Sequence, residues 1–231
     1  MKLMRTLIAL AAACGMLSAE QPQPPVVTPG RPPSDATILF NGRDMTGWVT
    51  SDGKAARCEV ESEVMTCTSG VGDILTTETF TDAQIHIEFA VPDMPGQTGQ
   101  LKGNSGVYLQ GKYEIQILDS YRNPTYAHGS LGGLYGQAGP LVNAARPPGQ
   151  WQSYDIIFHG PKCGDGGKVT RKATVTVVLN GLLIHDNVAI DASEKLGEGC
   201  HPGPILLQDH SGFPGAPVTR MKFRRIWMRR L

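Results

Sequence analysis

The sequence predicts an all-β fold, a jelly-roll sandwich of two antiparallel sheets, and three observations support this. Short runs of alternating or β-branched residues recur along the chain, separated by Gly, Pro, Asn and Asp. Almost no segment repeats its apolar residues with the 3.6-residue period of a helix. The dipeptide Asn180-Gly181, between two such runs, is typical of a tight hairpin turn. A dozen short strands at close spacing favour a sandwich over a mixed fold.

The chain begins with a segment that we do not expect to fold. Lys2 and Arg5 precede an apolar run that is followed by small residues. This pattern predicts a secretory signal peptide over residues 1–19. Residues 20–33 are rich in proline and predict an extended linker. A single β-sandwich domain is therefore expected over residues 34–231.

Two processing routes are compatible with this leader. Cleavage after Ala19 is one; the other is a lipid on Cys14, which would become the N-terminus and tether the protein to a membrane. Both predict an exported protein, periplasmic or secreted. Loss of residues 1–19 removes two basic and no acidic residues, so the net charge falls from +0 to about −2. Without a basic excess, the chain is not expected to bind nucleic acid.

The predicted strands follow the alternating runs in order. They cover residues 37–40, 57–60, 64–68, 74–76, 83–90, 105–110, 113–119, 152–159, 172–179, 182–186, 203–208 and 219–228. The last of these carries several arginines, which we expect to face solvent.

The Asn180-Gly181 turn fixes the register of one hairpin. A two-residue loop places Leu179 opposite Leu182, so that Val175, Val177 and Ile184 share an apolar face. His185 is then expected on the opposite, more polar face, together with Thr174 and Thr176.

A second hairpin is predicted over residues 103–120, GNSGVYLQGKYEIQILDS. In its second strand, Glu114 and Gln116 point to one side, whereas Ile115 and Ile117 point to the other and can form the core between the sheets. Glu114 and Gln116 are then expected on the concave face; on a convex face they would be ordinary solvated residues.

Four cysteines follow the leader, and four cysteines allow three pairings. Cys58 and Cys67 flank a short strand-turn-strand and could face each other across it. Cys163 and Cys200 lie in Gly-rich loops and would then form the second disulfide. No CxxC or HxxxH spacing supports the alternative, a metal site.

The longest segment without a predicted strand covers residues 121–150 and is rich in Gly, Pro and Asn. Loops of this length in compact domains are usually functional or disordered. The aromatic residues Tyr126 and Tyr135, with His128, favour a functional loop.

Several short phrases occur together in a specific order. They are LFNG at 39–42, TGW at 46–48, the 103–120 hairpin, GGLYG at 132–136, PPGQWQSYD at 147–155, NG at 180–181, HDN at 185–187, GP at 203–204 and LQDH at 207–210. From residue 37 to the C-terminus the chain thus resembles the 3-keto-disaccharide hydrolase domain family, also described as 3-keto-glucoside-1,2-lyase/3-keto-2-hydroxyglucal hydratase domains. Residues 211–217, SGFPGAP, depart from the family pattern and could reshape one edge of a pocket.

The resemblance implies a concanavalin A-like lectin/glucanase fold. It also implies a substrate: a glycoside already oxidised to a ketone at C3 by a separate dehydrogenase. The ketone acidifies the proton on C2, so that a base can remove it, the aglycone leaves from C1, and water adds to the resulting glycal. This chemistry requires a base near C2, a donor or cation at the C3 oxygen, and an acid for the leaving group.

Three residues are candidates for the catalytic base. His210 occupies the LQDH phrase, where Asp209 could orient its ring, and its alternative is an exposed loop histidine. His185 could equally be a surface residue of the outer sheet. Glu114 has the same role if its face is the concave one.

Candidate substrate-binding residues are Asn104, Tyr108, Gln110, Gln116, Asp119, Tyr135, Gln208 and Asp209. Their amide, hydroxyl and carboxylate groups can hydrogen-bond sugar hydroxyls. Asn104 and Asp119 could instead be turn residues. Trp48 and Trp151 could stack on sugar rings or belong to the core.

The sequence therefore favours a 3-keto-glycoside hydrolase/lyase. The alternatives are a non-catalytic carbohydrate-binding module and a conventional glycoside hydrolase, which would need a second carboxylate beside Glu114. No cofactor is assigned. A divalent metal could stabilise the enolate, but the sequence contains no clear ligand set.

Overall fold

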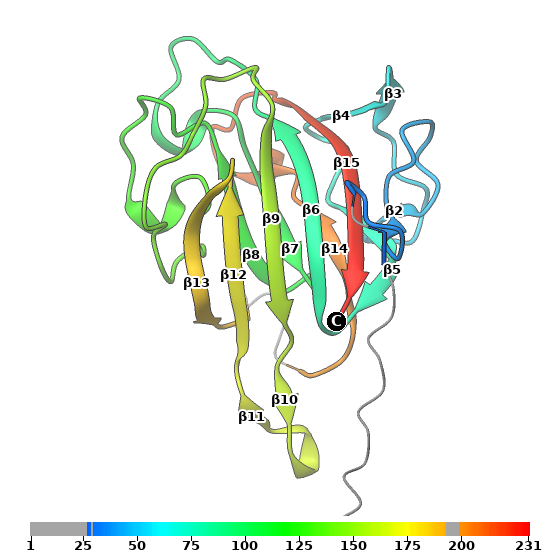
Figure 1. Cartoon of the computed structure of the whole chain (residues 1–231). Helices are drawn as coiled ribbons and strands as arrows, with labels where there is room; N and C mark the ends of the chain where they lie inside the picture. The colour runs from blue at the N-terminus through cyan, green and yellow to red at the C-terminus, as the bar shows by residue number, and fades with distance from the viewer. Residues whose placement is uncertain (1–26, 29, 193–198) are drawn as a thin grey trace, which may run out of the picture.

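The computed structural model describes residues 27–28, 30–192 and 199–231. The predicted signal peptide, the alternative lipid site at Cys14 and most of the predicted linker lie outside the described residues. The described chain is all-β, as predicted, and contains two stacked antiparallel sheets (Figure 1). None of its helices is long and apolar enough to cross a membrane.

The eight-stranded sheet has the order β13-β12-β9-β6-β15-β4-β3, with β1 paired to β15. Its strands are β1 (Thr37–Ile38), β3 (Glu59–Glu61), β4 (Val64–Thr68), β6 (Ala83–Ala90), β9 (Gln152–His159), β12 (Ala173–Leu179), β13 (Leu182–Ile190) and β15 (Arg220–Arg230).

The five-stranded sheet has the order β2-β5-β14-β7-β8. Its strands are β2 (Trp48–Thr50), β5 (Ile74–Phe80), β7 (Asn104–Leu109), β8 (Tyr113–Leu118) and β14 (Gly203–Leu207). A separate hairpin pairs β10 (Lys162–Cys163) with β11 (Val169–Arg171). Short 3₁₀ turns are η1 (Gly99–Leu101), η2 (Ala127–Gly129), η3 (Asp165–Gly167) and η4 (His210–Gly212).

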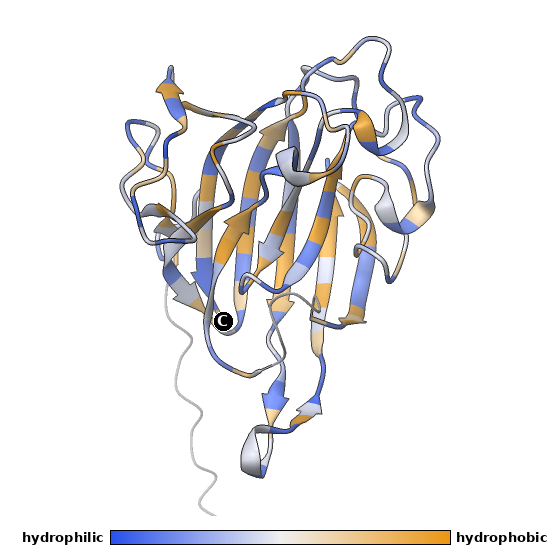
Figure 2. Ribbon diagram, turned by 180° about the vertical axis from the view of Figure 1, so that it is seen from behind, coloured by the Kyte–Doolittle hydropathy of each residue, from blue (hydrophilic) through white to orange (hydrophobic). Residues whose placement is uncertain are grey.

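The core lies between the two sheets and is built by alternation along each strand, visible as alternating colours in Figure 2. Ile85 and Ile87 on β6 and Ile115 and Ile117 on β8 of the other sheet belong to this core, and all four are fully buried. Their burial leaves the side chains of Glu114 and Gln116 on the outer face of the five-stranded sheet, as the alternation predicted.

Both predicted disulfides are present. Cys58 pairs with Cys67 across the β3–β4 hairpin, and Cys163 pairs with Cys200. Strands β2, β10 and β11 were not predicted, because each has only two or three residues and lacks an apolar alternation.

The β12–β13 hairpin confirms one register and corrects another. Leu179 pairs with Leu182, as predicted from the turn. Irregular pairing further along the hairpin places His185 opposite Val177 rather than on the polar face. His185 is only 2% exposed and its Nε2 lies 2.7 Å from the carbonyl oxygen of Gly132. The expectation that His185 shares a face with Thr174 and Thr176 is therefore wrong.

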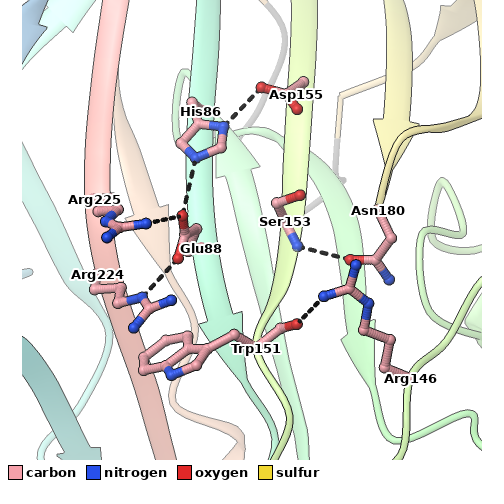
Figure 3. A network of polar contacts seen from close by, with 9 residues as sticks. All are labelled: His86, Glu88, Arg146, Trp151, Ser153, Asp155, Asn180, Arg224 and Arg225. Carbon is pink, nitrogen blue, oxygen red and sulfur yellow. Dashed lines mark hydrogen bonds and ion pairs between the residues drawn. The ribbon is translucent and has the colours of Figure 1, made fainter. Parts of the chain in front are cut away.

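The outer face of the eight-stranded sheet carries a connected set of ion pairs (Figure 3). Glu88 accepts hydrogen bonds from Arg224 at 2.6 Å and Arg225 at 3.1 Å. The Arg224 guanidinium stacks over the Trp151 ring at 4.0 Å. Trp151 is thus covered by an arginine on the opposite side of the sandwich from Glu114, which leaves it no role in a sugar site on the five-stranded sheet.

The other arginines of β15 are also paired rather than simply solvated. Arg220 bonds Glu59 and Arg230 bonds Glu78. Trp48, the other tryptophan considered for stacking, is buried and donates its indole N–H to the carbonyl of Leu39 at 2.8 Å. It is a core residue.

Candidate active site

A cleft of about 520 Å³ lies on the outer face of the five-stranded sheet. It is lined by predicted site residues that come from distant parts of the sequence: Tyr108, Glu114, Gln116, Tyr135, Gln208, Asp209 and His210. Asp73, Gly212, Phe213 and Pro214 complete the lining. Seven of the eleven site residues predicted from the sequence thus line one cavity.

The sheet itself brings the polar floor of the cleft together. The backbone N–H of Gln208 donates to the carbonyl of Gly106 at 3.0 Å, and Gly106 pairs with Gln116 on the next strand. The side chains of Gln208 and Gln116 therefore flank a position that has no side chain. In the adjacent row, Tyr108 pairs directly with Glu114.

Glu114, Tyr108 and Gln208 form a short hydrogen-bonded chain. Gln208 Nε2 donates to the Tyr108 hydroxyl at 3.1 Å. The Tyr108 hydroxyl in turn donates to the Glu114 carboxylate. Burial raises the pKa of Tyr108, and the charge and hydrogen bond of Glu114 and the charge of Asp73 raise it further. Tyr108 is therefore a stable hydrogen-bond donor at neutral pH.

Asp209 does not orient His210, contrary to the sequence-based expectation. Its carboxylate accepts hydrogen bonds from the backbone N–H groups of Gly70, Gly72 and Ser211, at 2.7, 2.7 and 2.9 Å. Burial would raise the pKa of Asp209, but these donors outweigh it and hold the pKa below its ordinary value. Asp209 ties the turn before β5 to the segment after β14.

His210 is held in the cleft by an aromatic contact. Its ring stacks on Phe213 with centroids 5.1 Å apart and an interplanar angle of 24°. No side-chain hydrogen bond joins the ring to the described part of the chain. Burial lowers the pKa of His210, and the charge of Asp209 opposes the shift only partly. The imidazole is thus neutral at pH 7 and can accept a proton.

The long loop over residues 121–150, coloured green in Figure 1, contributes Tyr135 to the cleft. Its backbone pairs with the free edge of β8: Gly132 donates to the carbonyl of Gln116 and Gln116 donates to the carbonyl of Gly133, both at 2.9 Å. This pairing carries Tyr135 into the cleft lining.

Tyr135 is supported by a second tyrosine of the same loop. The hydroxyl groups of Tyr126 and Tyr135 lie 2.9 Å apart. Burial, with the hydrogen bond to Tyr135, raises the pKa of Tyr126 to about 12. The Tyr126 phenol is therefore protonated at neutral pH.

Two predicted amide ligands have structural contacts instead of lining the cleft. Asn104 Nδ2 donates to the backbone carbonyl of Gln100 at 2.9 Å, beneath η1. Gln110 sits in the β7–β8 turn with φ +52°, and its Nε2 donates to the carbonyls of Phe80 and Thr81 at 3.1 and 3.2 Å. Asn104 lines only a neighbouring, much narrower cavity of about 20 Å³.

Asp119 and His185 also lie away from the cleft lining. The buried carboxylate of Asp119 binds Lys102 Nζ at 2.8 Å. His185 holds Gly132, and burial lowers its pKa despite that hydrogen bond. His185 therefore supports the loop over residues 121–150, and the structure gives it no access to a substrate in the cleft.

Sequence reasoning missed four residues of the cleft: Asp73, Gly212, Phe213 and Pro214. Asp73 follows a Gly-containing turn, and nothing in its local sequence distinguishes it from a turn residue. Phe213 belongs to the 211–217 insertion, which was noted as a possible change to the pocket but without a residue. Among the described residues, no three His, Cys, Asp or Glu side chains group to hold a metal ion.

The cleft of this antiparallel sandwich offers amides, carboxylates, tyrosine hydroxyls and a histidine, which are groups that can bind a carbohydrate. The chain belongs to the family of 3-keto-alpha-glucoside-1,2-lyase-like domains, which matches residues 35–229. This confirms the resemblance found in the sequence.

Solved structures agree with this assignment. A crystal structure of a "putative glycosyl hydrolase" from Parabacteroides distasonis is 42% identical, with a TM-score of 0.84 over 94% of this chain and 95% of that one. A second structure of the same description and organism is 21% identical, with a TM-score of 0.62 over 85% and 94% of the two chains, and shows the fold alone.

A Bacillus licheniformis beta-glucanase, 14% identical with a TM-score of 0.51 over 85% of this chain and 98% of its own, shares the fold alone. No curated protein sequence matches the chain.

Proposed function

We propose that the protein cleaves glycosides that carry a ketone at C3, by elimination across C2 and C1 followed by hydration of the glycal. One observation carries the proposal: the neutral imidazole of His210 and the Tyr108–Glu114 pair line the same cleft. A base and an acid on one substrate face are what this elimination requires. The family assignment supports the same substrate class.

In the first step, His210 removes the proton from C2, and the electron pair passes to the C3 oxygen as an enolate. The enolate then expels the C1 substituent as the C1–C2 double bond forms and the C3 ketone returns. Tyr108 gives its hydroxyl proton to the leaving oxygen. Water then bonds to C1 through its oxygen and gives one proton to Tyr108, which restores the acid, while His210 returns a proton to C2.

The remaining polar groups fit supporting roles. The Tyr135 hydroxyl, which lies 2.9 Å from that of Tyr126, can donate to the C3 oxygen as negative charge develops there. Gln116 and Gln208 have amide oxygens without a hydrogen-bond partner in the described chain. Such acceptors suit sugar hydroxyl groups, which can donate to them.

The proposal includes a supplier and a location. A separate dehydrogenase must oxidise the glycoside at C3 before this protein can act, because the C2 proton of an unoxidised sugar is not acidic. We further propose that the chain is exported, as its leader suggests. The two disulfides are compatible with an oxidising compartment.

A conventional glycoside hydrolase is a second candidate, because of Asp73. The sequence suggested that Glu114 lacks a carboxylate partner, yet Asp73 and Glu114 line the same cleft. Two carboxylates are the usual catalytic pair of such enzymes. A non-catalytic carbohydrate-binding module is the third, and it predicts saturable binding without turnover.

A substrate comparison separates the three candidates. We expect the protein to cleave a 3-keto disaccharide and to leave the matching unoxidised disaccharide intact, with products followed by chromatography. Cleavage of both sugars at similar rates would favour the conventional hydrolase. Binding without cleavage of either would favour the binding module.

A further inference from the structure

A second hollow of about 450 Å³ lies beside the cleft and shares Asp73 with it. Its other walls are the turn from Thr50 to Arg57 and the glycines Gly70 and Gly72. We propose that this hollow is the subsite for the leaving group, and that it takes a neutral sugar unit. This inference rests on the proposed function, which supplies the reaction. It adds where the leaving group of the substrate binds and what chemistry that group has.

The ridge between the two hollows is fixed by hydrogen bonds. The Asp209 carboxylate holds the N–H groups of Gly70 and Gly72, both at 2.7 Å. The backbone N–H of Asp209 donates to Asp73 Oδ1 at 2.7 Å. A ligand that crosses Asp73 therefore meets a surface that is already in place, which reduces the entropy lost on binding.

The opposite wall is equally well defined. Thr50 N donates to the carbonyl of Lys54 at 2.8 Å, and Thr50 Oγ1 donates to Asp52 Oδ1 at 2.5 Å. A β-bridge between Val49 and Ala55 closes the base of this turn. Hydrogen bonds and a β-bridge therefore fix the conformation of this turn.

The lining of the hollow matches hydroxyl groups rather than an aromatic aglycone. Thr50, Ser51 and Asp52 offer hydroxyl and carboxylate oxygens, and Lys54 and Arg57 offer N–H donors. No aromatic residue is among the described residues that line it. Sugar hydroxyls both donate and accept, and so can use all of these groups.

Arg57 is the residue best placed to select the ligand. Its side chain is exposed, and within the described chain no hydrogen bond or ion pair engages its guanidinium. Lys54, by contrast, is already paired with Asp52 at 2.5 Å. Because Asp52 and Asp73 balance the two cations, the hollow has no net charge, which favours a neutral sugar over an acidic one.

The boundary between the hollows also lies near the reacting groups. The charge of Asp73 contributes to the raised pKa of Tyr108, so the shared residue is close to the Tyr108–Glu114 pair. A glycoside whose oxidised ring occupies the cleft would then have its leaving oxygen near that pair and its second unit beyond Asp73.

Calorimetry on the full chain tests the subsite without turnover, because the probes are unoxidised. The probes are methyl glucoside, and maltose, cellobiose and trehalose as neutral disaccharides. We expect the best disaccharide to bind about tenfold more tightly than methyl glucoside, and Arg57→Ala to remove most of that difference. Arg43→Ala, an exposed arginine outside both hollows, should leave it unchanged.

Equal affinities for methyl glucoside and all three disaccharides would overturn the subsite, as would an unchanged preference in Arg57→Ala. A disaccharide ending in a uronic acid that binds about tenfold more tightly than its neutral counterpart would overturn the neutral assignment. If the disaccharide preference holds but no 3-keto glycoside is cleaved, the subsite stands and the proposed reaction is wrong.

Discussion

The Glu114 carboxylate occupies the space that a side chain on Gly106 would need. A Cβ atom built on Gly106 would lie 2.7 Å from Glu114 Oε1 and 3.0 Å from Cε2 of Tyr108. The absence of a side chain on β7 therefore allows the two polar groups to meet over the middle of the sheet. Gly106 thus contributes to the floor of the cleft by leaving room for the contact between Glu114 and Tyr108.

Gly106→Ala should displace Glu114 from Tyr108 and lower kcat about 100-fold, because misplacing a reacting group by about 1 Å can cost that much. The measurement is kcat on a 3-keto disaccharide, with a thermal melt to verify folding. Gly212→Ala adds the same methyl group in the same cleft, where no atom of the described residues lies within 4 Å. If both variants lose activity equally, crowding of the substrate and not displacement of Glu114 is the cause.

His210→Ala should lower kcat by about 10²–10⁴-fold, the usual contribution of a general base. In the wild type, the base is lost when the imidazole is protonated. Since burial lowers the pKa of His210 from its ordinary value of 6.5, kcat/KM should fall only below pH 6.5. His201, exposed in a surface loop, is the matched control. An acid limb that survives in His210→Ala would assign it to another group.

Phe213→Ala should release the His210 ring. The pKa of His210 should rise toward 6.5 as its burial decreases, which NMR titration of the ring protons measures without substrate. We also expect kcat to fall up to about tenfold, in keeping with the energy of a stacked pair. Phe213→Trp should restore both values. An unchanged His210 titration in Phe213→Ala would contradict this role.

Asp209→Ala removes the acceptor of three backbone N–H groups and should lower the free energy of unfolding by about 1–3 kcal/mol. The pKa of Asp209 is lower in the folded protein, so its carboxylate stabilises the fold above the unfolded pKa. This contribution disappears as pH falls through the folded pKa. Urea unfolding at pH 7 and at pH 3 should show a smaller difference in the variant than in the wild type.

His185 should also make stability depend on pH, because its buried ring is neutral in the folded protein. Its pKa is lower in the folded protein than the ordinary 6.5, so the unfolded chain binds the proton first. Stability should therefore decrease as pH falls below about 6.5. Thermal melts of His185→Gln should show less of this decrease. Because the pKa of His210 is also lowered in the folded protein, part of this decrease in stability should remain in His185→Gln.

Features set by neighbours in the chain could be predicted from the sequence. The strands Val64–Thr68, Ala83–Ala90 and Gln152–His159 were predicted to the residue, because each alternates clearly. The facing of Glu114 and the Cys58–Cys67 pairing also follow from local spacing.

Features set by tertiary packing could not be predicted from the sequence. The irregular pairing that buries His185 has no signal in the alternation of β13. Asp119 is a turn residue by sequence, yet in the fold it binds Lys102. Asp73 is hydrogen-bonded in the cleft to the backbone N–H of Asp209, a residue more than 130 positions later in the chain.

The most direct test of the central claim is NMR of the reaction of a 3-keto disaccharide in D₂O. Removal and return of the C2 proton by His210 predicts one deuterium at C2 of the 3-keto sugar product, and none in the His210→Ala sample, which should be nearly inactive. A product that forms at full rate without deuterium at C2 would contradict the account, because the C2–H bond would then never break.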